Sequence, residues 1–267
     1  MVCREAADPP RPPKPQPFLP VVVRCMLRRT VIAADWRVFH VPKFSLRLDV
    51  LPEAQRRLWG ELSAVPPEFT LYGGTALALH LGHRKSVDFD FFGSRAIDVS
   101  SLEGKIPFLG GAAVIQREKN TLSVIVDRGA PVKVSFFGVP KLPRLAPPVV
   151  AEDTGLKIAS LIDLVAGTQA SVLQVRAEAK DYIDIDALIQ IGKVSLPFAL
   201  AAAERLYGST FNPEITLKAL SYFDDGNLRE LPTDMKFRLA NAVNKVDLDR
   251  LPSVDDFNLR KDRGLGQ

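Results

Sequence analysis

The feature that most constrains this chain is a pair of short apolar segments, one ending in two glycines and the next carrying two acids. Phe69–Tyr72 predicts a strand that runs directly into Gly73-Gly74-Thr75, and Ala76–Gly82 predicts a short apolar helix. The chain then returns through Ser86–Phe92, which predicts a second strand. The segment therefore predicts a strand, a tight turn, a helix and a returning strand in close succession.

The returning strand carries carboxylates at Asp88 and Asp90. Because side chains two residues apart in a strand point to the same face, both acids are expected together, with Val87, Phe89 and Phe91 on the opposite face. Two like charges this close repel each other, and a bound divalent cation is the usual remedy. The pattern therefore predicts a metal site at the two acids.

The glycine turn has the composition of a phosphate-binding loop. Gly73 and Gly74 would let the backbone approach a phosphate closely, and the helix behind them offers free N–H groups to an anion. Thr75 is expected either to cap that helix or to bond a phosphate oxygen. Arg84 is expected to meet a triphosphate or to pair structurally with an acid.

Three motifs follow one another along the chain. They are Gly73-Gly74-Thr75, Arg84-x-Ser86-x-Asp88-x-Asp90 and Arg176-x-x-x-Lys180-Asp181-Tyr182-x-Asp184. This combination resembles the nucleotidyltransferase superfamily that includes DNA polymerase β, and most of all its AbiEii/AbiGii branch, the toxins of type IV toxin–antitoxin and abortive-infection systems. The resemblance covers about residues 49 to 230. It implies an α/β (α+β) fold, with a polymerase-β-like nucleotidyltransferase lobe built on a mixed sheet, a helical C-terminal lobe, and the nucleotide between them.

The resemblance also implies a reaction and roles for individual residues. The reaction is transfer of a nucleoside monophosphate from a nucleoside triphosphate to an RNA (tRNA) or protein acceptor, assisted by Mg²⁺ or Mn²⁺. A cognate antitoxin is an implied partner. The resemblance implies that Asp88 and Asp90 bind the metal, that Ser86 positions phosphate or metal, and that phosphate is bound by Gly73, Gly74, Thr75 and Arg84. It implies that Asp181 takes a proton from the acceptor or orients it. It implies that Lys180 compensates phosphate charge. A helix-surface ion pair between Lys180 and Asp181 is the alternative interpretation.

The chain departs from the pattern of these relatives at two positions. A third carboxylate normally faces the paired acids from a neighbouring strand, and Ser135 is expected at that place. A lysine normally precedes the Lys180-Asp181 helix, and Gln169 is expected there, although Lys157 could substitute for it. These departures favour an alternative function, a catalytically weak or inactive nucleotidyltransferase fold that binds nucleotide or a partner.

Composition places the chain among ordinary globular proteins. Its 267 residues, 46% hydrophobic and 25% charged, suit one large domain or two modest ones. No apolar run approaches the roughly eighteen residues of a membrane span, so no membrane association is expected. Cys3 and Cys25 form no disulfide or zinc pattern, which favours a reducing cytoplasm. The net charge of +4 permits contact with nucleic acid without requiring it. His80 and His83 are expected as surface histidines.

The sequence predicts four segments. Residues 1–44 are rich in proline and are expected to be a disordered extension or to precede the true start. Residues 45–150 are expected to form the nucleotidyltransferase core, with antiparallel strands at 112–119, 121–127 and 131–139. Residues 151–250 are expected to form the helical lobe, and residues 251–267 a flexible tail. The remaining predicted helices are 51–65, 98–109, 177–189, 195–208, 212–223 and 232–246.

Overall fold

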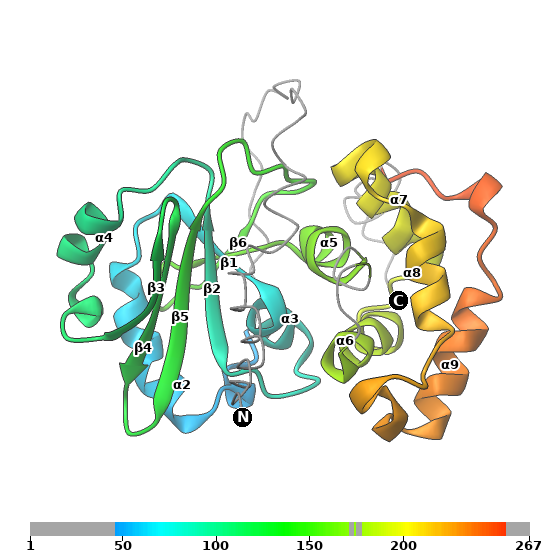
Figure 1. Cartoon of the computed structure of the whole chain (residues 1–267), viewed down its shortest axis with the longest axis horizontal. Coiled ribbons are helices and arrows are strands. Elements are labelled where there is room, and N and C mark those ends of the chain that lie inside the picture. Colours follow the sequence, from blue (N-terminus) through cyan, green and yellow to red (C-terminus); the bar gives the residue numbers. More distant parts are fainter. Residues whose placement is uncertain (1–45, 171–173, 175–177, 255–267) are drawn as a thin grey trace, which may run out of the picture.

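The computed structural model describes residues 46–170, 174 and 178–254, and their strands form one sheet (Figure 1). The strands are β1 Phe69–Tyr72, β2 Asp88–Gly93, β3 Ala113–Glu118, β4 Thr121–Asp127, β5 Pro131–Gly138, β6 Val149–Val150 and β7 Lys157–Ile158. Their order across the sheet is β3-β4-β5-β2-β1-β7-β6. β2 runs parallel to β5 and β1 parallel to β7, while the other neighbours are antiparallel. The predicted mixed sheet is confirmed.

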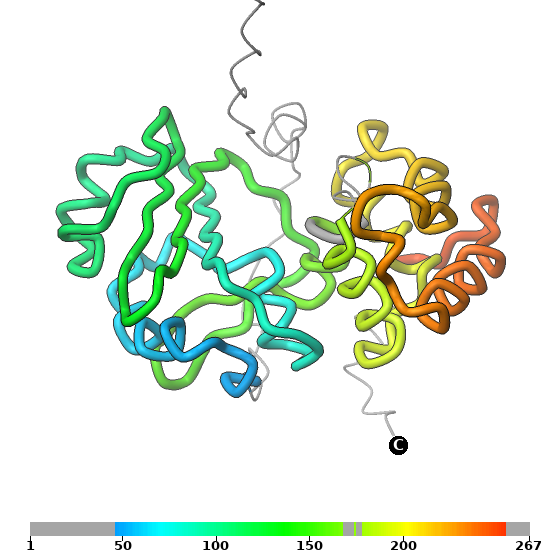
Figure 2. Tube along the Cα trace, turned by 60° about the horizontal axis from the view of Figure 1, so that its bottom comes forward, coloured from blue at the N-terminus to red at the C-terminus, as the bar shows by residue number. Residues whose placement is uncertain are grey.

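Eight α-helices accompany the sheet in the described part of the chain. They are α2 Glu53–Trp59, α3 Gly73–Leu81, α4 Val99–Lys105, α5 Leu161–Leu164, α6 Ala179–Gln190, α7 Leu196–Tyr207, α8 Pro213–Leu220 and α9 Thr233–Val243. Figures 1 and 2 show the sheet with α2 and α4 on one side of the molecule and α5 to α9 grouped on the other. The predicted helical C-terminal lobe is therefore present. None of these described helices is long and apolar enough to cross a bilayer.

The two faces of β2 differ, as its alternating sequence predicts. Phe89 and Phe91 are fully buried on one face, where Phe89 meets Trp59 of α2 and Phe91 stacks on Phe136 of β5. The acids lie on the other face and are half-buried. Val87 was expected beside the phenylalanines, but it precedes the strand and is 60% exposed. The strand thus begins at the first acid.

Local capping chemistry places several helix ends where the sequence predicts them. The Asp98 carboxylate accepts from the first turn of α4, Ser195 caps α7, and Asn212 caps α8. The first predicted helix is shorter than expected, because α2 ends at Trp59 and gives way to a 3₁₀ segment, Gly60–Ala64.

The sheet extends beyond residue 150, where the sequence placed the end of the core. Its last strands, β6 and β7, reach Ile158, so the residues between them follow the sheet and not the helices. The predicted N-terminal extension, residues 1–44, and most of the predicted tail, residues 255–267, lie outside the described residues.

Candidate active site

The glycine turn after β1 brings the backbone close to three functional side chains. Gly73 has φ +75°, a conformation that side chains disfavour, and a Cβ there would lie 3.1 Å from Oδ2 of Asp90. A Cβ on Gly74 would lie 2.6 Å from Nη2 of Arg84 and 3.3 Å from Oγ of Ser86. The two glycines are therefore needed for the contact between the start of α3 and the predicted phosphate and metal ligands.

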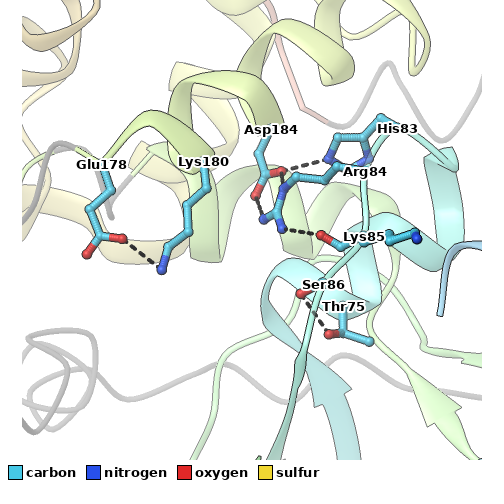
Figure 3. Close-up of polar contacts among 8 residues, drawn as sticks. All are labelled: Thr75, His83, Arg84, Lys85, Ser86, Glu178, Lys180 and Asp184. Atoms are coloured by element: carbon cyan, nitrogen blue, oxygen red, sulfur yellow. Dashed lines mark hydrogen bonds and ion pairs between the residues drawn. The ribbon is translucent and has the colours of Figure 1, made fainter. Parts of the chain in front are cut away.

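Thr75 ties the start of α3 to the start of β2 (Figure 3). Its buried hydroxyl donates to the backbone carbonyl of Asp88, and it is hydrogen-bonded to the Ser86 hydroxyl at 2.9 Å. The helix has Tyr72 as its N-cap, without a capping side chain. Of the two alternatives for Thr75, the helix cap is excluded, because its hydroxyl is engaged with the neighbouring strand. Its contact with a phosphate remains a prediction.

The strand register places Ser135 directly opposite Asp90 and Lys133 opposite Asp88, on the same face of the sheet. Ser135 is fully buried, and its hydroxyl receives a hydrogen bond from Ser123 at 3.2 Å. Ser135 therefore occupies the place that the sequence analysis expected for a third carboxylate.

The donor set at this face suits a cation that is shared with a ligand. Among the described residues, no three His, Cys, Asp or Glu side chains gather closely enough to hold a metal ion by themselves. Mg²⁺ in nucleotide sites commonly takes one or two carboxylates and fills its remaining positions with phosphate oxygens and water. Asp88 and Asp90 fit that arrangement and do not form an all-protein cage.

Lys133 is a residue of this face that the sequence analysis did not select. It lies beside Asp88 in the register of β2 and β5 and is half-buried. A cation at this position adds positive charge next to the carboxylate pair. The alternation of β5 shows which of its residues lie on the same face as Lys133. Only the pairing of β5 with β2 shows that Lys133 stands opposite an acid.

Arg84 and His83 both bind Asp184 of α6, about a hundred residues away in the chain (Figure 3). Arg84 donates from Nε at 2.6 Å and from Nη2 at 2.7 Å, one bond to each carboxylate oxygen. His83 Nε2 lies 2.7 Å from Oδ1. Burial by itself would raise the pKa of Asp184, but the hydrogen bonds from His83 and Arg84 outweigh it and hold the pKa below its usual value.

These contacts decide two open points of the sequence analysis. Of the two alternatives for Arg84, pairing with an acid is the one observed, and contact with a nucleotide remains a prediction. The expectation of surface histidines is wrong for His83, whose side chain is only 4% exposed because it packs against Asp184 between the two lobes. His80 Nε2 lies 2.8 Å from the carbonyl of Ala159.

The first turn of α6 holds Lys180 and Asp181 in different surroundings. Lys180 is exposed and pairs with Glu178 at 2.7 Å. Asp181 is 3% exposed and accepts from the backbone N–H of Glu178 in a capping box. Asp181 and Asp184 are both buried, and a cap and an ion pair satisfy their carboxylates. The catalytic roles of Lys180 and Asp181 remain predictions.

The position of the second departure, Gln169, lies in a π-helical segment, Val165–Ala170. Its side chain, like Arg176, lies outside the part of the chain that the structure describes. Lys157 was considered as a substitute, but its ammonium donates to the carbonyl of Pro67 at 2.7 Å. Pro67 precedes β1, at the end opposite Gly73, so Lys157 is directed away from the glycine turn.

A buried polar cluster attaches the segment after β5 to β1 and α5. Arg144 donates to the Thr70 hydroxyl at 3.1 Å, and the Leu145 N–H donates to Asp163 at 2.5 Å. Asp163 also accepts from the Ser160 hydroxyl at 2.9 Å. Burial raises the pKa of Asp163 to about 6, although the Leu145 N–H, Ser160 and Arg144 oppose the rise.

Comparison with known proteins gives a family match, a relative and a solved structure. The family described as "Nucleotidyl transferase AbiEii toxin, Type IV TA system" matches residues 56–257. An uncharacterized protein of Aquifex aeolicus is 31% identical over 160 residues, which are 59% of this chain and 75% of that protein. A crystal structure of a candidate nucleotidyltransferase from H. pylori covers 75% of this chain and 96% of its own, with 17% identity and a TM-score of 0.44. That structural likeness is too slight to carry an argument.

Proposed function

Because this chain belongs to the AbiEii family of nucleotidyl transferase toxins of type IV toxin–antitoxin systems, we propose that it transfers a nucleoside monophosphate from a nucleoside triphosphate to an RNA (tRNA) or protein acceptor. The observation that carries the proposal is the contact between the glycine turn and the acids of β2. Gly73 lies against the carboxylate of Asp90, so a phosphate at the turn and a cation at the acids would be neighbours. That adjacency is what transfer from a metal-bound triphosphate requires.

Asp88 and Asp90 are the residues that would hold Mg²⁺ or Mn²⁺ together with the triphosphate. A cation there would neutralise phosphate charge and orient the nucleotide for in-line attack. The carboxylates are half-buried and share one face of β2, so they can act on one ligand.

The phosphate contacts are proposed for the residues around the first turn of α3. Gly73 and Gly74 leave backbone space there, and the N–H groups of a helix start favour an anion. Arg84 and Ser86 border Gly74 and would contact phosphate oxygens. Thr75 keeps this turn attached to β2.

Lys180 and Asp181 are proposed for the acceptor side of the reaction. Lys180 is exposed at the start of α6 and would offset phosphate charge. Asp181 would take a proton from the acceptor or orient it. Since Asp181 is buried in a capping box, it would act only if the acceptor displaced part of that cap.

A second candidate function is supported by Ser135. A hydroxyl opposite Asp90 supplies no negative charge, so the site has fewer anionic metal ligands than a three-carboxylate site. This favours a protein that binds nucleotide or a partner with little or no transfer.

Incubation of the purified chain with each labelled nucleoside triphosphate, Mg²⁺ or Mn²⁺, and total RNA or cell lysate would separate the two functions. The transferase predicts label on an RNA or protein, lost in Asp88→Asn. Nucleotide binding without any label transfer would contradict transfer and support the binding function.

The toxin role and a cytoplasmic location are proposed from the family. Expression in a bacterial host is expected to arrest growth, and a co-expressed antitoxin from the neighbouring gene is expected to relieve the arrest. Equal arrest by the Asp88→Asn variant would show that the effect is not catalytic.

A further inference from the structure

The contact between Asp184 and Arg84 joins the helical lobe to the sheet lobe at the glycine turn. Asp184 is almost fully buried, with 2% of its side chain exposed, and Arg84 is 19% exposed. Both oxygens of the carboxylate accept from the guanidinium, at 2.6 and 2.7 Å. A paired, bidentate geometry of this kind fixes the plane of the guanidinium as well as its place.

The same guanidinium borders the predicted phosphate site. Its Nη2, the atom bonded to Oδ2 of Asp184, is the atom that a Cβ on Gly74 would meet at 2.6 Å. The next atom that this Cβ would meet is the hydroxyl of Ser86, at 3.3 Å. Arg84 is therefore held beside the first turn of α3 by an acid that belongs to the other lobe (Figure 3).

Arg84 also retains donors for a ligand. A guanidinium has five N–H groups, and the hydrogen bonds described for Arg84 use three of them, two to Asp184 and one to the carbonyl of Lys85 at 3.1 Å. The remaining two lie on the nitrogens Nη1 and Nη2. These can donate to a phosphate oxygen while the bond to Asp184 stays in place.

We propose that Asp184 is a positioning residue for the triphosphate: it fixes Arg84 beside Gly74 and so makes nucleotide affinity depend on the docking of α6. The inference rests on the proposed function, since it requires that a triphosphate binds at the glycine turn. Asp184 itself does not touch the nucleotide. It acts through the orientation of Arg84 and through the contact of His83 with the same carboxylate.

The chain contains a matched control two residues further along α6. Asp186 is also nearly buried, and it also receives a bidentate arginine, Arg238 of α9, at 2.9 and 2.7 Å. This pair lies within the helical lobe and joins α6 to α9. Asp184→Asn and Asp186→Asn therefore remove the same charge from the same helix, with only the first change affecting the glycine turn.

The experiment measures binding of a non-hydrolysable nucleoside triphosphate with Mg²⁺ by calorimetry, together with urea unfolding, for both variants. Both are expected to lose stability to a similar degree. Asp184→Asn is expected to bind the nucleotide about tenfold more weakly or worse, and in transfer assays to raise KM more than it lowers kcat. Asp186→Asn is expected to keep the affinity of the unmodified chain.

Unchanged affinity in Asp184→Asn, or equal weakening in both variants, would overturn the positioning role. If Asp184→Asn does not fold, Arg84→Lys provides the second test. It keeps the positive charge and leaves His83 on Asp184, and it is expected to weaken binding because lysine cannot be held bidentately. Absence of nucleotide binding by the unmodified chain would instead refute the proposed function, and the inference with it.

Discussion

Asp90 and Ser135 stand directly opposite each other on β2 and β5, and Ser135 is the residue expected where the family pattern has a third carboxylate. The pairing also aligns Ser123 of β4 with Ser135, and the two hydroxyls are hydrogen-bonded. A buried hydroxyl pair thus takes the place of a charged group. In the proposed function, metal binding would consequently depend on Asp88, Asp90 and the phosphates of the nucleotide.

Ser135→Asp is expected to restore a metal ligand at a cost in stability. Without metal, a buried carboxylate facing Asp90 should lower the free energy of unfolding by about 2 kcal/mol or more, because burial and a like charge both oppose its ionisation. Saturating Mn²⁺ should therefore raise the melting temperature of the variant more than that of the unmodified chain. Equal rises in the two proteins would show that residue 135 does not reach the metal.

Asp88→Asn is expected to reduce nucleotidyl transfer by two orders of magnitude or more, since it removes one of two carboxylates that would hold the cation. Its melting temperature should stay close to that of the unmodified chain, because Asp88 is only half-buried. Label transfer measured at fixed Mg²⁺ checks the first expectation. Glu118→Gln on the edge strand β3 serves as the control and should transfer normally.

Gly73→Ala is expected to destabilise the chain by about 1–2 kcal/mol, since the left-handed conformation at φ +75° disfavours a side chain. The added methyl would also lie 3.1 Å from Oδ2 of Asp90, so nucleotide binding should weaken. Urea unfolding and calorimetry measure the two effects. Gly104→Ala in α4, with open space around its Cβ, should be neutral or slightly stabilising.

The buried acids Asp163 and Asp184 are expected to give opposite pH dependences. Burial raises the pKa of Asp163 from about 3.8 to about 6, so its contribution to stability is full below pH 3.8 and is lost as the pH rises to 6. The pKa of Asp184 is lowered, so its contribution is present above pH 3.8 and is lost as the pH falls through the lowered value.

Urea unfolding of Asp163→Asn, Asp184→Asn and the unmodified chain between pH 3.5 and 7 would measure how each free energy of unfolding changes with pH. Relative to Asp163→Asn, the free energy of unfolding of the unmodified chain should fall by roughly 2 kcal/mol between pH 4 and 6. Relative to Asp184→Asn, it should gain stability as the pH rises from 3.5. Parallel curves for all three proteins would contradict both assignments.

Local patterns were sufficient to predict much of this fold. The alternation in β2 separated Phe89 and Phe91 from the acids, and the caps at Asp98 and Ser195 depend only on side chains within three residues of each helix start. The family resemblance implied that Ser135 stands at the third carboxylate position, and the register places it opposite Asp90.

Interactions between distant segments could not be predicted in this way. The burial of Asp184 depends on His83 and Arg84 from another lobe, and nothing within α6 indicates that partner. The hydroxyl of Thr75 looked like a helix cap because its neighbours in sequence are helical, yet its partner is on the returning strand. Lys133 gained its place beside Asp88 only through the pairing of β2 with β5.

The hundred residues between Arg84 and Asp184 also set an order of assembly during synthesis. Ribosomes add about 5 to 20 residues per second, so the acid is made roughly 5 to 20 seconds after the arginine that it holds. The glycine turn and both carboxylates of β2 thus leave the ribosome well before the helix that fixes Arg84. A nascent chain stopped short of α6 carries the predicted metal ligands without Asp184, which holds Arg84. The proposed nucleotide site would therefore be complete only after most of the protein has been translated.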